Sequence, residues 1–269
     1  MTGRHPQRKW GSDRQLTELL ESLPGGVGVA TRDFALVTLA AQLSGSFPGQ
    51  LVFKGGFVLR HVHGIHRFSK DVDATKTDPA RHKLDSDEVA EAIRQASIHN
   101  VVRFIPEEPA TNSARSLDFD DVAVRGESIP DTTVQVEVSY REAVLDAPEL
   151  ARVGAPFYEE FEVLTMTVPE MAAEKLRTLA QRLRPTDLAD QAALLQRTPE
   201  KDDGHIAELA VAKFELVKAG RANRIDRIHA HLEEMGETYD IVVPELFPNA
   251  PSYREAMGIV APRLRNLVP

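Results

Sequence analysis

The stretch LVFKGGFVLRHVHGIHRFSKDVDA, residues 51–74, contains the pattern from which the fold and the chemistry of this chain can be inferred. It begins with a short apolar strand that ends at the glycine pair Gly55-Gly56. A helical turn and a loop then lead to a second short strand, which carries Asp71 and Asp73. Because side chains alternate along a strand, both carboxylates point to one face, with Cα atoms about 6.5–7 Å apart.

Two carboxylates on one strand face can share a hard cation such as Mg²⁺, which takes oxygen ligands. A glycine turn before them lets backbone N–H groups approach a phosphate. Ser69 and Lys70 flank the acids and are either phosphate contacts or plain loop residues. The stretch therefore predicts a metal-dependent phosphoryl or nucleotidyl transfer site. The competing interpretation is a pair of solvated acids on an edge strand.

Three further residues are candidates for the same chemistry. Glu137 lies on an alternating strand, opposite three valines, and is either solvent-facing or a third carboxylate for a metal or a proton. Lys175 borders the apolar face of a helix and is either a surface lysine or a cation for a triphosphate. Asp187 is in the first turn of the next helix, where a carboxylate also stabilises the helix dipole.

The histidines near the glycine pair, His61, His63 and His66, do not follow the spacing of a zinc site. Asp71 and Asp73 favour a harder ion. We interpret the histidines, together with the neighbouring arginines, as a basic patch or an exposed loop rather than as metal ligands.

Outward from this stretch, helices come first, a mixed α/β middle follows, and the C-terminal part is helical. This order predicts an α+β fold with a small mixed β-sheet flanked by helices, and a C-terminal helical lobe. The expected lobes are 1–166 and 167–269. Helices are expected at 13–23, 32–44, 57–62, 85–96, 168–182, 187–197, 203–219, 222–235 and 251–259, and strands at 50–54, 70–75, 101–105, 114–125, 133–140 and 161–166.

The composition limits the class of protein. Of the 269 residues, 42% are hydrophobic and none is cysteine, so a core can form while disulfides and thiolate chemistry are excluded. No long apolar run is present, and we expect a cytoplasmic protein without a membrane segment. The net charge of -9 argues against a general nucleic-acid coat protein, although an enzyme can contact RNA through a local patch.

In combination, these residues resemble the AbiEii/MenT family of nucleotidyltransferase toxins, within the DNA-polymerase-β-like nucleotidyltransferase superfamily. The family pattern K-G-G followed by R-x-S-x-D-x-D corresponds to Lys54-Gly55-Gly56 and the run from Arg67 to Asp73. The later A-x-K-L and R-x-x-D-L-x-D-L patterns correspond to the stretches that begin at Ala173 and Arg184. Two positions depart from the pattern: Phe57 replaces a small hydroxyl residue, and Gln191 replaces a leucine.

The resemblance implies a nucleotidyltransferase fold. It also implies transfer of a nucleoside monophosphate from an NTP, with Mg²⁺ as the metal ion and Mn²⁺ as the alternative. It implies tRNA as the acceptor, at its 3′ end, and a separately encoded antitoxin as partner. The implied catalytic residues are Asp71, Asp73, Lys175, Asp187 and Glu137, with Asp71, Asp73 and Glu137 at the metal. The implied nucleotide-binding residues are Lys54, Gly55, Gly56, Arg67, Ser69 and Lys70.

Two other functions stay open. The same type of site can modify a protein or a cationic small molecule such as an aminoglycoside, and the acidic charge of the chain suits a cationic acceptor. A catalytically inactive binding partner is the third possibility, although the full set of acids and the lysine argues against it.

Overall fold

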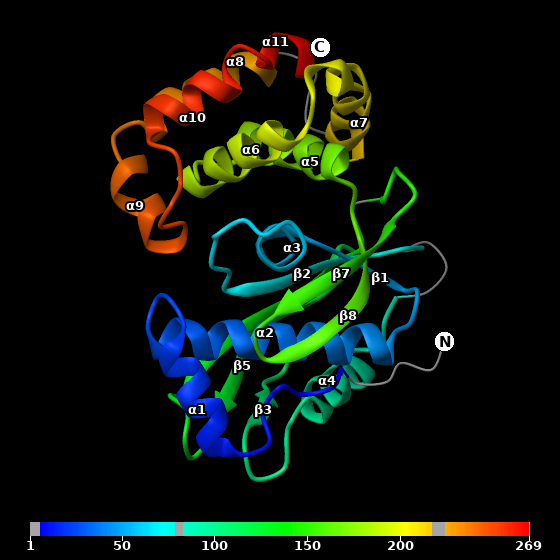
Figure 1. Ribbon diagram of the computed structural model, residues 1–269. Coiled ribbons are helices and arrows are strands. Elements are labelled where there is room, and N and C mark those ends of the chain that lie inside the picture. Colours follow the sequence, from blue (N-terminus) through cyan, green and yellow to red (C-terminus); the bar gives the residue numbers. More distant parts are fainter. Residues whose placement is uncertain (1–5, 79–82, 142, 217–223, 269) are drawn as a thin grey trace. The chain divides into compact units, whose positions relative to one another are not determined.

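The computed structural model describes residues 6–78, 83–141, 143–216 and 224–268 (Figure 1). These residues form two compact units. The first unit comprises the described parts of 1–64, 68–144 and 148–165, and the second comprises 65–67, 145–147 and the described parts of 166–269. Each unit is described separately below.

The first unit is built on one mixed sheet of eight strands, in the order β3-β5-β6-β2-β1-β8-β7, with β4 paired to β5. The central strand β2 pairs antiparallel with β1 and parallel with β6. The strands are β1 (Leu51–Lys54), β2 (Asp71–Lys76), β3 (Arg103–Pro106), β4 (Thr111–Asn112), β5 (Ser116–Arg125), β6 (Thr132–Ser139), β7 (Glu149–Ala155) and β8 (Tyr158–Thr165).

Helices of the first unit cover this sheet. The long helix α2 (Val27–Ser46) packs against β2, β6 and β8, and α1 (Asp13–Ser22) and α4 (Ser86–Gln95) pack against α2 (Figure 1). Because α2 is apolar on nearly all sides, most of its length is buried. The short helix α3 (Gly55–His61) follows β1 directly and packs against β1 and β2.

The second unit is helical, with α5 at its centre. Helix α5 packs against α6, α7 and α8, while α6 also packs against α9 and α10. The helices are α5 (Val168–Gln181), α6 (Pro185–Arg197), α7 (Asp203–Leu216), α8 (Arg224–Met235), α9 (Tyr239–Leu246), α10 (Tyr253–Val260) and α11 (Leu264–Leu267), with a 3₁₀ turn at Glu200–Asp202. None of the helices in the described part of the chain is long and apolar enough to cross a membrane.

The predicted order of strands and helices is confirmed, and so is the α+β class. In β6 the valines are buried while Gln135 is exposed and Glu137 is half-buried, as the alternation predicts. Four elements are not predicted from the sequence because they are short or lack a clear period: β7, β4, α9 and α11. Parts of two expected helices, 217–219 and 222–223, lie outside the described residues.

The start of α2 was predicted wrongly. The helix begins at Val27, and Thr31 and Asp33 are buried inside it instead of capping a later start. The Thr31 hydroxyl donates to the Val27 carbonyl, and Asp33 binds two side chains of α3. Polar residues that resemble a cap therefore satisfy tertiary contacts here.

Thr167 caps the start of α5, but Glu170 does not complete a capping box with it. The Thr167 hydroxyl accepts from the Glu170 N–H, at 3.2 Å. The Glu170 carboxylate instead accepts from the backbone N–H groups of Leu145 and Asp146 and lies 2.6 Å from the ammonium of Lys213. Glu170 is fully buried, so these partners replace the local one.

Candidate active site

A row of four side chains crosses the centre of the sheet in the first unit. Lys54 of β1 pairs with Asp73 of β2, Asp73 pairs with Glu137 of β6, and Glu137 pairs with Asp118 of β5. Paired residues on neighbouring strands point to the same face of a sheet. The register therefore brings together residues that are up to 83 positions apart in the sequence, the separation between Lys54 and Glu137. We call this set, Lys54, Asp73, Glu137 and Asp118, the carboxylate row.

Asp71 lies on the same face, two residues before Asp73. Both carboxylate residues are half-buried, whereas Val72 between them is buried on the other face. The Ser69 hydroxyl donates to Asp71 Oδ1 over 2.7 Å, so Ser69 holds this carboxylate in place. Lys70 is exposed, and its backbone carbonyl accepts from the Gln135 N–H.

The glycine pair begins α3 rather than forming a separate turn. Gly55 has a φ of 68°, and a Cβ at this position would collide with Asp73 Oδ2. Glycine is needed here for both reasons, because other residues are strained at positive φ and none would leave space for the carboxylate. Gly56 is buried in the first turn of α3.

Phe57, which departs from the family pattern, is a core residue. It is fully buried, with its ring centroid 6.0 Å from that of Phe53 and 5.1 Å from that of His61. The aromatic side chain therefore packs into the interior, and the nearest hydroxyl contact to the acids comes from Ser69 instead.

Asp118 was not selected by the sequence analysis. Its Oδ2 accepts from the Ser116 hydroxyl at 2.8 Å, while its Oδ1 is buried with no hydrogen-bond partner in the described part of the chain. The only signal in the sequence was that Asp118 and Ser116 alternate with Leu117 and Phe119, which places the two polar residues on one strand face. The register was needed to show that this face is the one that carries Glu137.

A buried network of charges occupies the second unit. The Lys175 ammonium of α5 lies 2.8 Å from Asp187 Oδ1 and 2.9 Å from Asp190 Oδ2, both on α6. Arg182 contacts Asp187 through two nitrogens, and the Arg67 Nε donates to Asp190 Oδ1 at 2.6 Å. We call these five residues the ion network. Three cations and two carboxylates leave it with one net positive charge.

Charge pairing outweighs burial in this network. Burial by itself would raise the pKa of Asp187, but Lys175 and Arg182 hold that pKa well below its usual range. Burial would likewise lower the pKa of Lys175, and Asp187 and Asp190 raise it above its usual value. Asp187 and Lys175 are therefore both charged near neutral pH.

Arg67 differs in its placement from the other predicted nucleotide-binding residues. It belongs to the second unit, where it binds Asp190, whereas Ser69 and Lys70 belong to the first. Arg182 was not among the predicted site residues, although it contacts Asp187. The motif residue Arg184 is instead exposed. Asp190 belongs to the R-x-x-D-L-x-D-L pattern but was not predicted as a site residue. It is fully buried and forms ion pairs with both Arg67 and Lys175.

One histidine near the glycine pair, His61, has a structural role. His61 is buried, with Nε2 3.0 Å from Asp33 Oδ1 and Nδ1 3.3 Å from the Gly154 carbonyl. Arg60 donates twice to the same carboxylate, and these partners hold the pKa of Asp33 below its usual range although burial opposes them. His61 and Arg60 therefore attach α3 to α2.

Asp71, Asp73 and Glu137 supply oxygen donors, which is the chemistry that Mg²⁺ and Mn²⁺ prefer. Within the described ranges, however, no three His, Cys, Asp or Glu side chains are gathered closely enough to hold a metal ion. The three carboxylates thus match a hard divalent ion in residue type, but their arrangement in the described structure does not form a three-ligand site.

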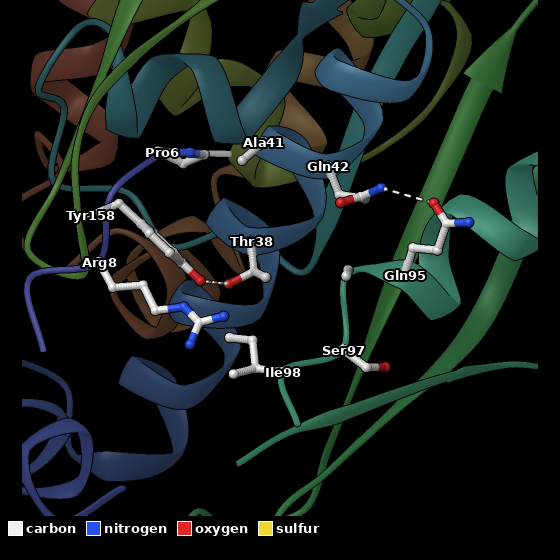
Figure 2. Close-up of a pocket in the computed structure, with 10 residues that line it drawn as sticks. Pro6, Arg8, Thr38, Ala41, Gln42, Gln95, Ser97, Ile98 and Tyr158 are labelled. Atoms are coloured by element: carbon white, nitrogen blue, oxygen red, sulfur yellow. Dashed lines mark hydrogen bonds between the residues drawn. The ribbon is translucent and has the colours of Figure 1, made fainter. Parts of the chain in front are cut away.

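A separate hollow of about 200 Å³ lies between the N-terminal segment, α2, β8 and the residues after α4 (Figure 2). In it the hydroxyls of Thr38 and Tyr158 are 2.8 Å apart, and the Gln42 amide donates to Gln95. Burial raises the pKa of Tyr158 to about 12. The lining includes none of the predicted site residues. Arg8 pairs with Tyr158 in a β-bridge, which attaches this N-terminal segment to the unit.

Comparison with known proteins identifies relatives. A family model described as "Nucleotidyl transferase AbiEii toxin, Type IV TA system" matches residues 39–259. Among solved structures, MenT4, a nucleotidyltransferase toxin from Mycobacterium tuberculosis H37Rv, is similar with a TM-score of 0.61 and 19% identity, over 97% of this chain and 100% of that one. JHP933 from Helicobacter pylori is similar with a TM-score of 0.58 and 15% identity, over 89% and 91%. No curated protein matches the chain. The two structural likenesses confirm the predicted fold.

Proposed function

Because the chain belongs to the AbiEii nucleotidyl transferase toxin family of type IV toxin–antitoxin systems, we propose that it transfers a nucleoside monophosphate from an NTP to the 3′ end of tRNA. The 3′-hydroxyl oxygen of the acceptor attacks the α-phosphorus and forms a new P–O bond. Pyrophosphate leaves with the electron pair of the broken bond. A tRNA extended in this way cannot be aminoacylated normally, and translation stops.

The observation that supports this function is the carboxylate row together with Asp71. Two carboxylates two residues apart on β2 share a face with Glu137 on the neighbouring strand. We assign Asp71 and Asp73 to hold Mg²⁺ or Mn²⁺, with Glu137 either as a further ligand or as the acceptor of the hydroxyl proton. When bound, the ion neutralises phosphate charge and polarises the α-phosphate.

The remaining residues bind and orient the nucleotide. We assign the backbone N–H groups of Gly55 and Gly56, at the start of α3, to the phosphates, with Ser69 as a hydroxyl contact. Lys54 and Lys70 carry positive charge beside the acids. In the second unit, Lys175 is assigned to neutralise phosphate charge, with Asp187 holding its ammonium and Arg67 supporting Asp190. Catalysis is then mainly positioning and electrostatics.

The first test is labelling of tRNA. Purified protein is incubated with tRNA, Mg²⁺ and each of the four NTPs carrying an α-phosphate label. We expect one or two NTPs to label the RNA at its 3′ end, and Asp71→Asn to remove the label while the fold persists. If no NTP labels any acceptor and no NTP binds, the nucleotidyltransferase function is excluded.

A second candidate acceptor is a cationic small molecule or a protein. Asp118 and Glu137 make the row acidic, which would repel the phosphates of RNA and attract amines. Offering tRNA, total protein and aminoglycosides side by side separates the acceptors. Label on an aminoglycoside with none on tRNA would favour this candidate.

The family implies two further properties that belong to the same proposal. An antitoxin encoded separately would control the protein, and the site of action would be the cytoplasm, where tRNA is available. Expression in a bacterial host tests the toxic activity directly. We expect the wild-type chain to stop growth and Asp71→Ala to permit it. Equal toxicity of the two chains would instead indicate a binding protein without catalysis.

A further inference from the structure

Asp118, at one end of the carboxylate row, has no role in the proposed nucleotidyl transfer. Asp118 lies on β5, one strand beyond Glu137 and two strands beyond Asp73. Neighbouring strands are about 4.8 Å apart, so Asp118 is too far out to share one small ion with Asp73. Across the sheet the order is Asp73, Glu137, Asp118. A group that contacts Asp118 must therefore extend past Glu137, away from Asp73.

The carboxylate of Asp118 can accept one more hydrogen bond. Ser116 occupies Oδ2, whereas Oδ1 is buried and finds no donor in the described part of the chain. A buried acceptor without a partner is unfavourable, so such atoms normally receive a bond from water or a ligand. A carboxylate oxygen in this position accepts a hydrogen bond, so the missing partner is a donor such as a hydroxyl or an amine.

Two fully buried hydroxyls lie on the same face as the acids. Thr75 pairs with Ser139, and Ser139 pairs with Ser116, in the register row next to the carboxylate row. Both Thr75 and Ser139 are 0% exposed, and neither hydroxyl has a hydrogen-bond partner within the described residues. A polar strip with unused hydrogen-bonding capacity thus lies beside the acids. This is unusual for a structural core, where buried hydroxyls are nearly always paired.

We infer that Asp118 binds the acceptor, by accepting a hydrogen bond from the 2′-hydroxyl of its terminal ribose. This inference rests on the proposed nucleotidyl transfer. If Glu137 accepts the proton of the attacking 3′-hydroxyl, one of its two assigned roles, the 2′-hydroxyl is on the adjacent carbon of the sugar. The next acceptor along the row is Asp118. A carboxylate at this place attracts hydroxyls and repels phosphates, which favours a sugar end with two free hydroxyls over an internal nucleotide.

The test compares two acceptors that differ in a single atom. One RNA ends in an ordinary ribose, and the other has the same sequence with a 2′-deoxy terminal sugar. Transfer of labelled nucleotide is measured for wild-type protein, Asp118→Ala and Asp118→Asn. Glu159→Gln is the control, because it removes one negative charge from an exposed position on β8.

We expect wild-type protein to prefer the ribose end about ten- to hundredfold in kcat/KM, as a hydrogen bond to a charged group provides. Asp118→Ala should lose that preference through a higher KM for the ribose acceptor. The KM for the NTP should stay unchanged. Asp118→Asn retains an acceptor oxygen and should keep part of the preference, and Glu159→Gln should behave as wild type.

Each opposing result overturns a different statement. If wild-type protein transfers nucleotide but Asp118→Ala keeps the full preference, the assignment of Asp118 is wrong and the proposed function survives. If Asp118→Ala loses activity equally on both acceptors, its role is structural, and a lowered melting temperature would accompany it. If nothing is labelled by wild-type protein, the proposed function fails and the inference fails with it.

Discussion

The carboxylate row and the ion network contain the same types of side chain in two different electrostatic situations. In the first unit, Asp71, Asp73, Glu137 and Asp118 are half-buried along a sheet face. In the second, the side chains of Asp187 and Asp190 are 2% and 0% exposed, and cations contact both of them. Half-buried acids remain open to a ligand, whereas buried acids must be neutralised by the protein itself. We expect the row to control activity and the network to control stability as well.

The largest expected effect is on activity, at Asp73. Asp73→Asn keeps the shape of the side chain and removes the charge that we assign to the metal. We expect transfer to fall about a thousandfold, or ~4 kcal/mol in transition-state stabilisation, while the urea midpoint changes little. Measuring kcat/KM and urea unfolding on the same preparation checks both parts. Retained transfer would remove Asp73 from the active site.

The next effect is on stability, at Lys175. Lys175→Met leaves Asp187 and Asp190 buried with fewer cations, and we expect a loss of about 3 kcal/mol in the free energy of unfolding. Arg14→Met is the control, because Arg14 and Glu18 form a surface pair whose side chains are 88% and 58% exposed. That change should cost about 0.5 kcal/mol or less. Equal losses in urea melts would show that burial does not distinguish the two pairs.

The ion network also predicts a pH dependence of stability. The lowered pKa of Asp187 contributes stability above the ordinary aspartate value, about 3.9, which is lost as the pH falls. The raised pKa of Lys175 contributes stability below the ordinary lysine value, about 10.4, which is lost as the pH rises. Urea midpoints should be level near neutral pH and decline at both ends. In Lys175→Met both declines should be weaker.

A smaller effect is expected at Gly55, where the row meets α3. Gly55→Ala combines the strain of positive φ, about 1–2 kcal/mol, with a clash against Asp73. Gly64 has nearly the same φ, 65°, and no atom near the position of a Cβ, so Gly64→Ala measures the strain alone. We expect both variants to be destabilised, and only Gly55→Ala to lose transfer activity. Similar activity in the two would mean that Asp73 tolerates displacement.

The smallest effect is a gain in stability at Gln191. This residue of α6 is fully buried, and neither atom of its amide group has a hydrogen-bond partner in the described chain. Gln191→Leu removes two unpaired polar atoms, and we expect a gain of about 1 kcal/mol. Gln196→Leu, on the same helix at an exposed position, should change stability by less than ~0.5 kcal/mol. A loss at Gln191 would show that its amide has a partner, such as an ordered water.

How far the site could be anticipated depended on the distance in sequence between its parts. Asp71, Asp73, Gly55 and Ser69 were identified because local rules apply to them: strand alternation, glycine conformation and loop composition. Asp118 and Arg182 could not be predicted as site residues from the sequence, because their partners are determined by strand register and helix packing. The start of α2 was missed for a related reason, since Asp33 resembles a helix cap and is in fact a buried partner of Arg60 and His61.

The amino-acid pattern was sufficient for the order of elements, the α+β class, the family and the pair of acids on one face of β2. These follow from periodicity and short motifs, which act over a few residues. Pairing of β2 with β6 and of β6 with β5 was required to align Asp73, Glu137 and Asp118, and packing of α5 on α6 was required to place Lys175 between two aspartates. Such contacts arise from burial of apolar faces by segments far apart in the chain, and no local rule specifies their register. The row that begins at the K-G-G and D-x-D motifs is therefore completed by Asp118, a residue that belongs to neither motif.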